Sequence, residues 1–198
     1  MQAGKPGYRS TPVCLYLSRP MESDDETLML RYRDGDASAF ETLYARHKGP
    51  VYRYLLRNCA QVEVAEELFQ ETWAGIVKAR KRYKPTARFR TFLFTMAHHR
   101  LVDHYRRRRP EHEPHDPERA ADERQAPDRQ LDRWEQAQAL RQAIAGLPAE
   151  QREAFLLKEE AGLGLEEIAA VTGVGSETAK SRLRYAFSKL KRLLGGES

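Results

Sequence analysis

The chain has 198 residues, a formal net charge of +5 and a pI of about 9.2, a size that allows one ordinary domain or two small ones and a charge compatible with a polyanionic partner. Its two cysteines, Cys14 and Cys59, form no CxxC pair and no cluster with histidine, so the sequence indicates neither a disulfide framework nor a zinc site and is typical of a reducing cytoplasm. No stretch approaches the roughly 18 apolar residues of a membrane span, and residues 1–20 lack the apolar segment of a signal peptide, so membrane insertion is not expected.

The first predicted domain covers residues 23–109 and is helical. Residues 1–22 precede it as a disordered tail, inside which Met21 offers an alternative start. Gly35 separates a short opening helix from a longer one, in which Pro50 is expected to introduce a bend. Apolar residues of the longer helix recur at intervals of three and four, the period of one buried helical face: Phe40, Leu43, Tyr44, His47, Val51, Tyr54 and Leu55.

Two further amphipathic helices are predicted in this domain, over Val62–Ala79 and Phe89–Arg107, with a loop at Arg80–Arg88 between them. The first should bury Ala65, Leu68, Phe69, Thr72, Trp73 and Ile76 and expose Glu63, Glu66, Glu67 and Glu71. The second should bury Phe89, Phe92, Leu93, Met96, Ala97 and Leu101. No useful length of the chain shows the alternating pattern of a strand.

Residues 110–130 differ in composition from what surrounds them. Four prolines interrupt a run of charged residues and histidines that contains almost no apolar side chain. Such a segment cannot bury a core and is expected to be a flexible linker. Residues 131–194 then form a second helical domain, with helices from Leu131 to about Ile144, from Pro148, over Leu165–Thr172 and over Ser176–Leu194. The predicted fold class is therefore all-α, with two small helical domains.

The segment Leu165–Leu183 predicts a helix-turn-helix. Ala169 is small enough for a second helix to cross closely over it, Gly173 supplies the tight turn, and Val174 fills the space between the helices. Short polar and basic residues then face outward, suited to base edges and phosphates: Ser176, Glu177, Thr178, Lys180, Ser181, Arg182 and Arg184. The alternative is an ordinary amphipathic helix with a solvated charged face.

A second basic cluster lies at the end of the first domain. Basic residues surround Tyr83 and Phe89 and continue along the last helix: Arg80, Lys81, Arg82, Lys84, Arg88, Arg90, His98, His99, Arg100 and Arg106–Arg109. Basic residues interleaved with aromatic ones suit single-stranded nucleic acid. Phe89 and Phe92 are better explained as core, whereas Tyr83 fits the core and DNA contact about equally, and Arg106–Arg109 alone would also fit a solvated helix end.

Metal and catalytic sites are not supported by the sequence. His98 and His99 are adjacent and point to different helix faces, and His112 and His115 lie in the predicted linker. No P-loop, GxSxG or HExxH motif occurs. We therefore expect no enzyme activity, no catalytic residue, no cofactor and no metal.

Segments of both domains resemble the extracytoplasmic-function (ECF) subfamily of bacterial RNA polymerase sigma factors. Ala65–Trp73, Phe89–Ala97 and Asp103–Arg107 resemble sigma region 2, and Leu147-Pro148, Arg152–Leu157 and Glu166–Leu183 resemble sigma region 4. The resemblance covers most of residues 24–194 in the right order. It implies a cytoplasmic, nucleoid-associated protein, or one held near the membrane by an anti-sigma factor.

The resemblance also implies a division of labour among the residues. Leu68, Gln70 and Glu71 would contact the clamp helices of the largest polymerase subunit, and region 4 would bind the flap of the second largest. The promoter −10 element would be melted and held by Arg80, Tyr83, Arg88, Arg90, Thr95, His98, His99, Asp103 and Arg106, and the helix from Ser176 would enter the −35 major groove. His99 stands where the family usually has Asn, and Phe92 where it has Trp, so the promoter sequence stays open.

Two other functions would account for parts of the sequence. A stand-alone helix-turn-helix regulator would explain residues 131–194 but not the basic and aromatic cluster at 80–109. An enzyme with an accessory DNA-binding tail would need a catalytic constellation, which the sequence lacks.

Overall fold

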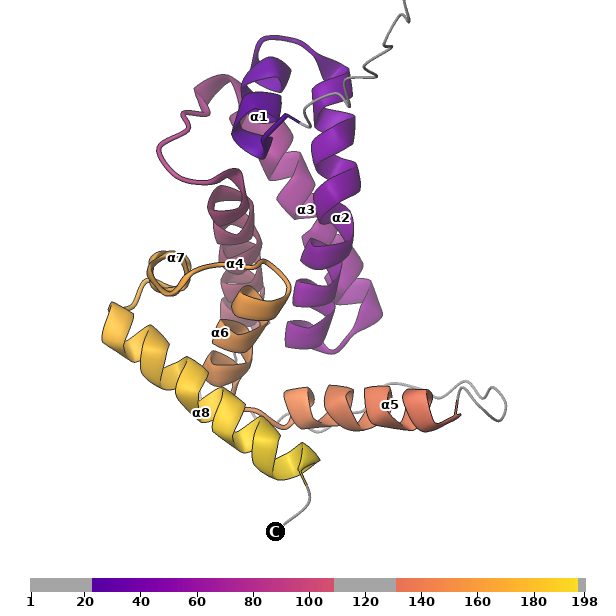
Figure 1. Cartoon of the computed structure of the whole chain (residues 1–198). Coiled ribbons are helices and arrows are strands. Elements are labelled where there is room, and N and C mark those ends of the chain that lie inside the picture. The colour runs from indigo at the N-terminus through magenta and orange to yellow at the C-terminus, as the bar shows by residue number, and fades with distance from the viewer. Residues whose placement is uncertain (1–22, 109–130, 196–198) are drawn as a thin grey trace, which may run out of the picture.

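The computed structural model describes residues 23–108 and 131–195 (Figure 1). The first range contains α1 (Asp25–Arg33), α2 (Ala37–Cys59), α3 (Val62–Ala79), the 3-10 turn η1 (Arg80–Arg82) and α4 (Phe89–Arg108). The second contains α5 (Leu131–Ala145), α6 (Ala149–Glu159), α7 (Leu165–Thr172) and α8 (Ser176–Leu194). No strand occurs in these two ranges, and the predicted all-α fold with two helical domains is confirmed. The predicted tail and linker lie outside the described residues.

Helix ends follow local rules of the sequence. The side chains of Asp24 and Asp36 accept hydrogen bonds from the first backbone N–H groups of α1 and α2, which have no partner inside the helix. Ala60 ends α2 in the left-handed region, at φ 57°, and donates its N–H to the carbonyl of Leu56. Pro50 lies inside α2, and the helix continues through it.

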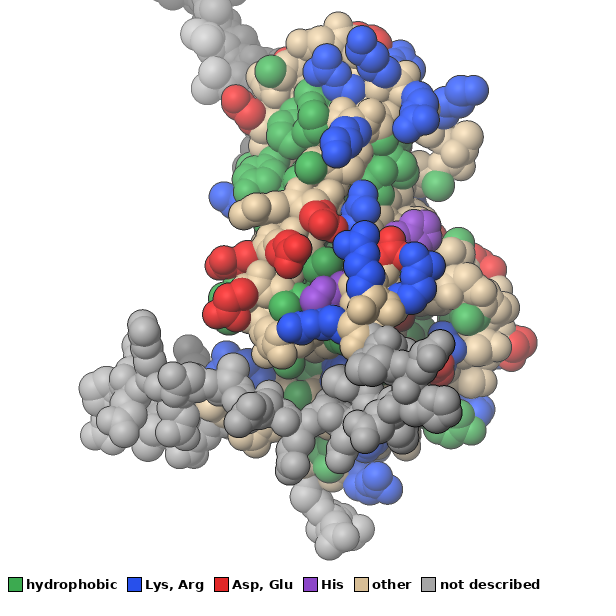
Figure 2. All heavy atoms as spheres, turned by 180° about the vertical axis from the view of Figure 1, so that it is seen from behind, with side chains coloured by type: hydrophobic (Ala, Val, Ile, Leu, Met, Phe, Trp, Pro, Cys, Tyr) green, Lys and Arg blue, Asp and Glu red, His purple; other side chains and the backbone are tan. Residues whose placement is uncertain are grey.

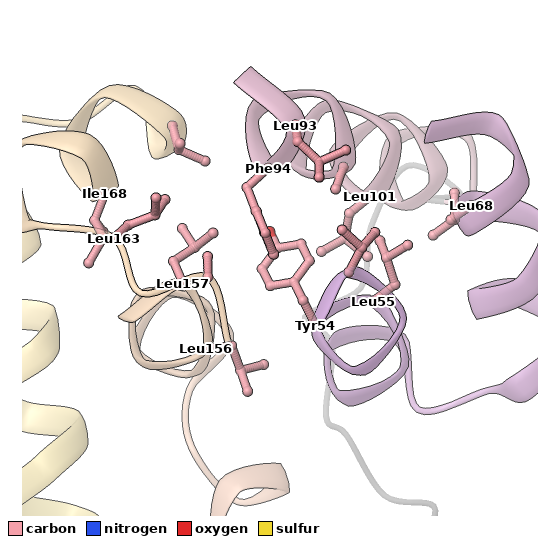
Figure 3. Close-up of a cluster of buried hydrophobic side chains, with 14 of the residues drawn as sticks. Tyr54, Leu55, Leu68, Leu93, Phe94, Leu101, Leu156, Leu157, Leu163 and Ile168 are labelled. Carbon is pink, nitrogen blue, oxygen red and sulfur yellow. The ribbon is translucent and has the colours of Figure 1, made fainter. Parts of the chain in front are cut away.

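Helices α1 to α4 pack around a core to which each contributes one face. Leu43, Val51, Leu55, Ile76 and Leu93 are fully buried, as the helical periodicity predicts. Tyr44, predicted to face inward, is 36% exposed and lies over an aromatic cluster instead. Phe94 was not part of the predicted buried face, yet it is fully buried because the second domain covers it (Figure 3).

Asp25 joins α1 to α2. Its carboxylate accepts a hydrogen bond from Arg46 at 2.9 Å and lies 2.7 Å from the buried ring of His47. Burial alone would raise the pKa of Asp25, but these two hydrogen bonds outweigh it and lower the pKa from 3.8 to about 2. The ionised carboxylate therefore stabilises the folded first domain.

Asp25→Asn is expected to lower the free energy of unfolding by roughly 2 kcal/mol at neutral pH. Because the folded pKa lies below the unfolded one, this contribution is complete above the unfolded value of 3.8 and disappears as the pH falls toward 2. Urea unfolding followed by circular dichroism at several pH values should show the difference between wild type and variant shrinking across that window. Asp34→Asn, at an exposed residue, is the control, and a difference that persists below the window would contradict this account.

The second domain is held together by α8, which packs on α5, α6 and α7. Ala179 and Ala186 are fully buried on α8, and small side chains there let the helices approach closely. Three large apolar residues of α5 and α8 are exposed: Leu140, Phe187 and Leu194, at 40%, 45% and 45%. Helices α5 and α8 therefore leave part of their apolar surface exposed.

The two domains touch along α2, α4, α6 and α7. Figure 3 shows Tyr54 and Phe94 of the first domain facing Leu156, Leu157, Leu163 and Ile168 of the second. All six of these side chains are essentially inaccessible to solvent. The contact is thus an apolar core shared by the two domains.

Candidate nucleic-acid and polymerase interfaces

Helices α7 and α8 form the predicted helix-turn-helix. Gly173 adopts φ 68°, a left-handed conformation that favours glycine, and the N–H of Val174 bonds the carbonyl of Ala169 at 3.1 Å. Ala169 and Ala179 are buried where the two helices cross. The positions that predicted the motif therefore have the geometric roles assigned to them.

The outward residues of α8 differ in how far they are exposed. Glu177, Thr178, Lys180 and Arg184 are exposed. Ser176 donates its hydroxyl to Glu166 at 2.6 Å, and Ser181 is half-buried. Arg182 is only 20% exposed because its guanidinium pairs with Glu150 of α6 at 3.0 Å. A base contact by Arg182 thus requires it to leave Glu150.

Lys180→Ala and Arg182→Ala are expected to weaken duplex binding in different ways. Lys180 is 64% exposed and suits a phosphate, so its loss should weaken all sequences equally and reduce the salt slope by about 0.9. Loss of Arg182 should cost about 1–3 kcal/mol and relax specificity at one base pair. Fluorescence anisotropy with −35 duplexes across salt concentrations measures both effects. Unchanged affinity in both variants would show that the helix-turn-helix does not recognise the promoter.

The loop between α3 and α4 is fastened to α1 at both ends. The Arg80 guanidinium lies over the ring of Tyr32, 5.3 Å from its centroid. At the far end, the backbone N–H of Phe89, the first residue of α4, donates to the Glu26 carboxylate at 2.6 Å. The role of Glu26 as a cap for α4 has no signal in the sequence, because it lies 63 residues away.

Tyr83 belongs to the core, which corrects its prediction as a DNA contact. The side chain is 4% exposed, and its ring packs on Phe92 with the centroids 5.3 Å apart. Burial, followed by the nearby charge of Glu26, raises the pKa of Tyr83 to about 12. A ring held inside the domain supports the loop but offers no surface for a base to stack on.

Arg88 and Arg90 are exposed at the start of α4. They line an open cavity of about 300 Å³ between α1 and α4, together with Ser23, Asp24, Asp25, Glu26 and Arg46. Figure 2 shows Lys and Arg side chains gathered over the end of the molecule where α1 and this loop lie. Both guanidinium groups are accessible, and the carboxylates of Asp24, Asp25 and Glu26 share the cavity with them, so their contact with phosphate stays a prediction.

The remaining predicted −10 residues follow α4 and differ in accessibility. Thr95 bonds the carbonyl of Thr91 at 2.7 Å, and the His98 ring lies 2.6 Å from the carboxylate of Glu153 in the second domain. His99 is exposed. Further along α4, Asp103 pairs with the exposed Arg106 at 3.0 Å. The structure therefore leaves His99 and Arg106 accessible and covers His98.

The predicted polymerase contacts lie on α3, and one of them requires correction. Leu68 is 3% exposed and belongs to the core, so its side chain cannot contact a partner. Gln70 is exposed, and Glu71 is half-exposed, with its carboxylate 3.8 Å from Arg100. Next to them lies a cluster of aromatic rings, in which Trp73 is buried as predicted, Phe40 and Phe69 are partly buried and Tyr44 is exposed.

The described part of the chain contains neither a candidate metal site nor a candidate membrane span. No group of three or more His, Cys, Asp or Glu side chains is placed to hold a metal ion there. None of the described helices is long and apolar enough to span a bilayer.

Comparison with known proteins identifies both domains. Residues 43–111 match the family model of sigma-70 region 2, and residues 137–190 match that of sigma-70 region 4. The chain is 34% identical to the RNA polymerase sigma factor CarQ of Myxococcus xanthus over 84% of its own length and 95% of that protein. It is 33% identical to the ECF RNA polymerase sigma factor RpoE of Cereibacter sphaeroides, over 86% and 94% of the two chains.

Solved structures share the fold. CnrH, in complex with the cytosolic domain of CnrY, matches with a TM-score of 0.64 and 24% identity over 88% of this chain and 99% of that one. The sigma factor RpoE of Bartonella quintana, in complex with the anti-sigma factor NepR, matches with a TM-score of 0.62 and 21% identity over 80% and 98%. Both family models, in this order and next to these relatives, place the chain in the ECF subfamily of RNA polymerase sigma factors.

Proposed function

We propose that this sigma factor binds core polymerase through the outer face of α3, holds the melted −10 strand along the start of α4, and reads the −35 element with α8. One observation carries the proposal. A helix-turn-helix with an exposed polar and basic face, in region 4, and a basic helix start, in region 2, occur in one chain. A stand-alone regulator would use only the first of these features.

The −35 element is the proposed ligand of α8. Its exposed residues Thr178, Lys180 and Arg184 supply hydrogen-bonding groups and positive charge on one side of the helix. A helix of this kind fits the major groove, where such groups reach base edges and phosphates.

The −10 strand is the proposed ligand of the first domain. Opening DNA costs about 1.4 kcal/mol per base-pair step in lost stacking, and a protein without an ATPase motif must recover this cost by binding the opened strand. Arg88 and Arg90 would hold phosphates, and His99 would contact an unpaired base. Tyr83 would act only as internal support for the loop.

Control by a protein partner is a further part of the proposal. The RpoE neighbour was solved with an anti-sigma factor, and we propose that an anti-sigma factor also restrains this chain in the cytoplasm. The chain itself would perform no chemistry: it would direct the polymerase, through the clamp helices of its largest subunit and the flap of the second largest.

Run-off transcription with core polymerase on a library of genomic promoters tests the proposed function. We expect transcripts that depend on both the chain and the core enzyme, and we expect the two to co-purify. Specific duplex binding without core dependence would instead favour a stand-alone helix-turn-helix regulator.

A further inference from the structure

Three carboxylates of the region 4 domain reach across to the region 2 domain. Glu160, which follows α6, accepts hydrogen bonds from Arg53 and Arg57 of α2, the first at 2.7 Å. Glu153 of α6 accepts a bond from the hydroxyl of Tyr54 at 2.7 Å and lies 2.6 Å from His98. Glu167 of α7 is the third carboxylate, and its partners in the first domain are Thr91 of α4 and Arg88 of the loop before α4.

Glu167 sits at the start of α7. It accepts a bond from the hydroxyl of Thr91 at 2.7 Å and from the N–H of Gly164 at 2.8 Å, with Arg88 at 3.9 Å. Burial would raise the pKa of Glu167, but the Gly164 and Thr91 hydrogen bonds lower it below its ordinary value. The carboxylate is therefore held in its ionised form at this contact.

These carboxylates have been withdrawn from water. The side chains of Glu160, Glu153 and Glu167 are 8%, 15% and 23% exposed. Removing a charge from water is costly unless partners compensate it, and here each carboxylate has at least two polar partners in the structure. Glu159, next to Glu160, is exposed. Burial against region 2 therefore distinguishes Glu160 from its acidic neighbour.

The groups that receive the carboxylates are of the kind that also bind phosphate. A guanidinium recognises carboxylate and phosphate oxygens with the same donors. Arg88 and His98 belong to the residues predicted to hold the −10 strand. Arg53 and Arg57 extend the same face along α2 and were not predicted as nucleic-acid contacts.

We propose that this face of region 2, defined by Arg53, Arg57, Arg88 and His98, binds the phosphate backbone of the melted strand. Region 4 occupies it with Glu160 on Arg53 and Arg57 and with Glu153 on His98, while Glu167 lies 3.9 Å from Arg88, which stays 74% exposed. The closed arrangement and binding of the strand at Arg53, Arg57 and His98 therefore exclude each other. This inference rests on the proposed −10 function and adds to it two phosphate-binding arginines and a competitor within the chain. An apolar contact between the domains backs the polar one (Figure 3), which explains how the closed state is held without DNA.

Adjacent glutamates provide a matched pair of variants. Glu160→Gln removes a carboxylate that holds two arginines, whereas Glu159→Gln removes the same charge one residue away at an exposed position. In the full-length chain, a donor and an acceptor dye are attached at Ala45→Cys and Ser188→Cys, both exposed residues, with Cys14 and Cys59 replaced by serine. Energy transfer between the dyes reports whether the domains are closed.

Binding of a labelled mixed-sequence single strand of about 16 nucleotides is measured on the same proteins. We expect the strand to lower energy transfer in wild type. We expect Glu160→Gln to lower transfer without DNA and to tighten strand binding by about ten-fold, since apparent affinity scales with the open fraction. Glu159→Gln should match wild type in both measurements. If the strand binds without changing energy transfer, or if Glu160→Gln and Glu159→Gln bind it with equal affinity, the closed arrangement and the strand-bound state do not exclude each other.

The arginines are tested in the opened protein. Arg53→Ala with Arg57→Ala, combined with Glu160→Gln, should lower the slope of log affinity against log salt by about 0.7 for each arginine. An unchanged slope would show that these arginines serve only the domain contact, and would overturn their assignment. If no variant binds the strand and open complexes with polymerase also fail to form, the proposed −10 function itself is wrong; normal open complexes with an unchanged slope confine the failure to this inference.

Discussion

Replacing Gln70 and Glu71 together by lysine is expected to abolish binding to core polymerase while leaving the helix content unchanged. Both side chains lie on the outer face of α3, whose inner face is committed to the core. Like charges forced together across an interface cost several kcal/mol, which corresponds to an affinity loss of more than about 100-fold. The weak pair between Glu71 and Arg100 is partly exposed, so its loss should hardly affect stability.

A matched control for this variant exists on α2. Glu41→Lys with Thr42→Lys changes the net charge by the same amount at exposed residues of the same domain. Anisotropy of labelled protein titrated with core enzyme should show near-normal affinity for the control and none for the α3 variant. Equal affinities would mean that the polymerase binds another surface of the domain, for which the aromatic cluster around Tyr44 is the alternative candidate.

His99→Ala is expected to impair promoter melting far more than binding to the closed promoter. His99 is the exposed histidine at the position where the family usually has Asn, and contact with one unpaired base is worth about 1–3 kcal/mol. Open complexes should therefore decrease by about one to two orders of magnitude. Permanganate reactivity of unpaired thymines measures the open complex, and duplex binding by the holoenzyme measures the closed one.

His104 supplies the control for His99. It lies on the same helix, half-buried, and His104→Ala should leave melting close to wild type. A His99 variant that melts the promoter at the wild-type rate would place the captured base elsewhere, with the cavity beside Arg88 and Arg90 as the alternative.

Local sequence rules predicted the helices almost to the residue. The bounds of α3, α7 and α8 agree with the predictions, because all three have a strong apolar period and glycines flank α7 and α8. The helix-turn-helix was predictable for the same reason. Its key residues, Ala169, Gly173 and Val174, act within one short segment.

What the sequence did not predict depends on tertiary contacts. A basic and aromatic stretch does not reveal which aromatic side chain turns inward, and Tyr83 turned inward against Phe92. The contact of His98 with Glu153 joins residues 55 positions apart, and neither has a local pattern that indicates the other. Phe94 is buried for the same reason, by a domain that its own helix cannot specify.

Both ends of the loop between α3 and α4 are attached to α1. The Arg80 guanidinium lies over the Tyr32 ring, and the N–H of Phe89 donates to the Glu26 carboxylate. Both attachment points on α1 follow Met21, so a chain translated from that methionine would retain them. A segment whose ends are already fixed has fewer conformations to lose when it is ordered on a ligand. Strand capture by this loop should therefore carry a small entropic penalty, and shortening α1 should weaken capture by raising that penalty.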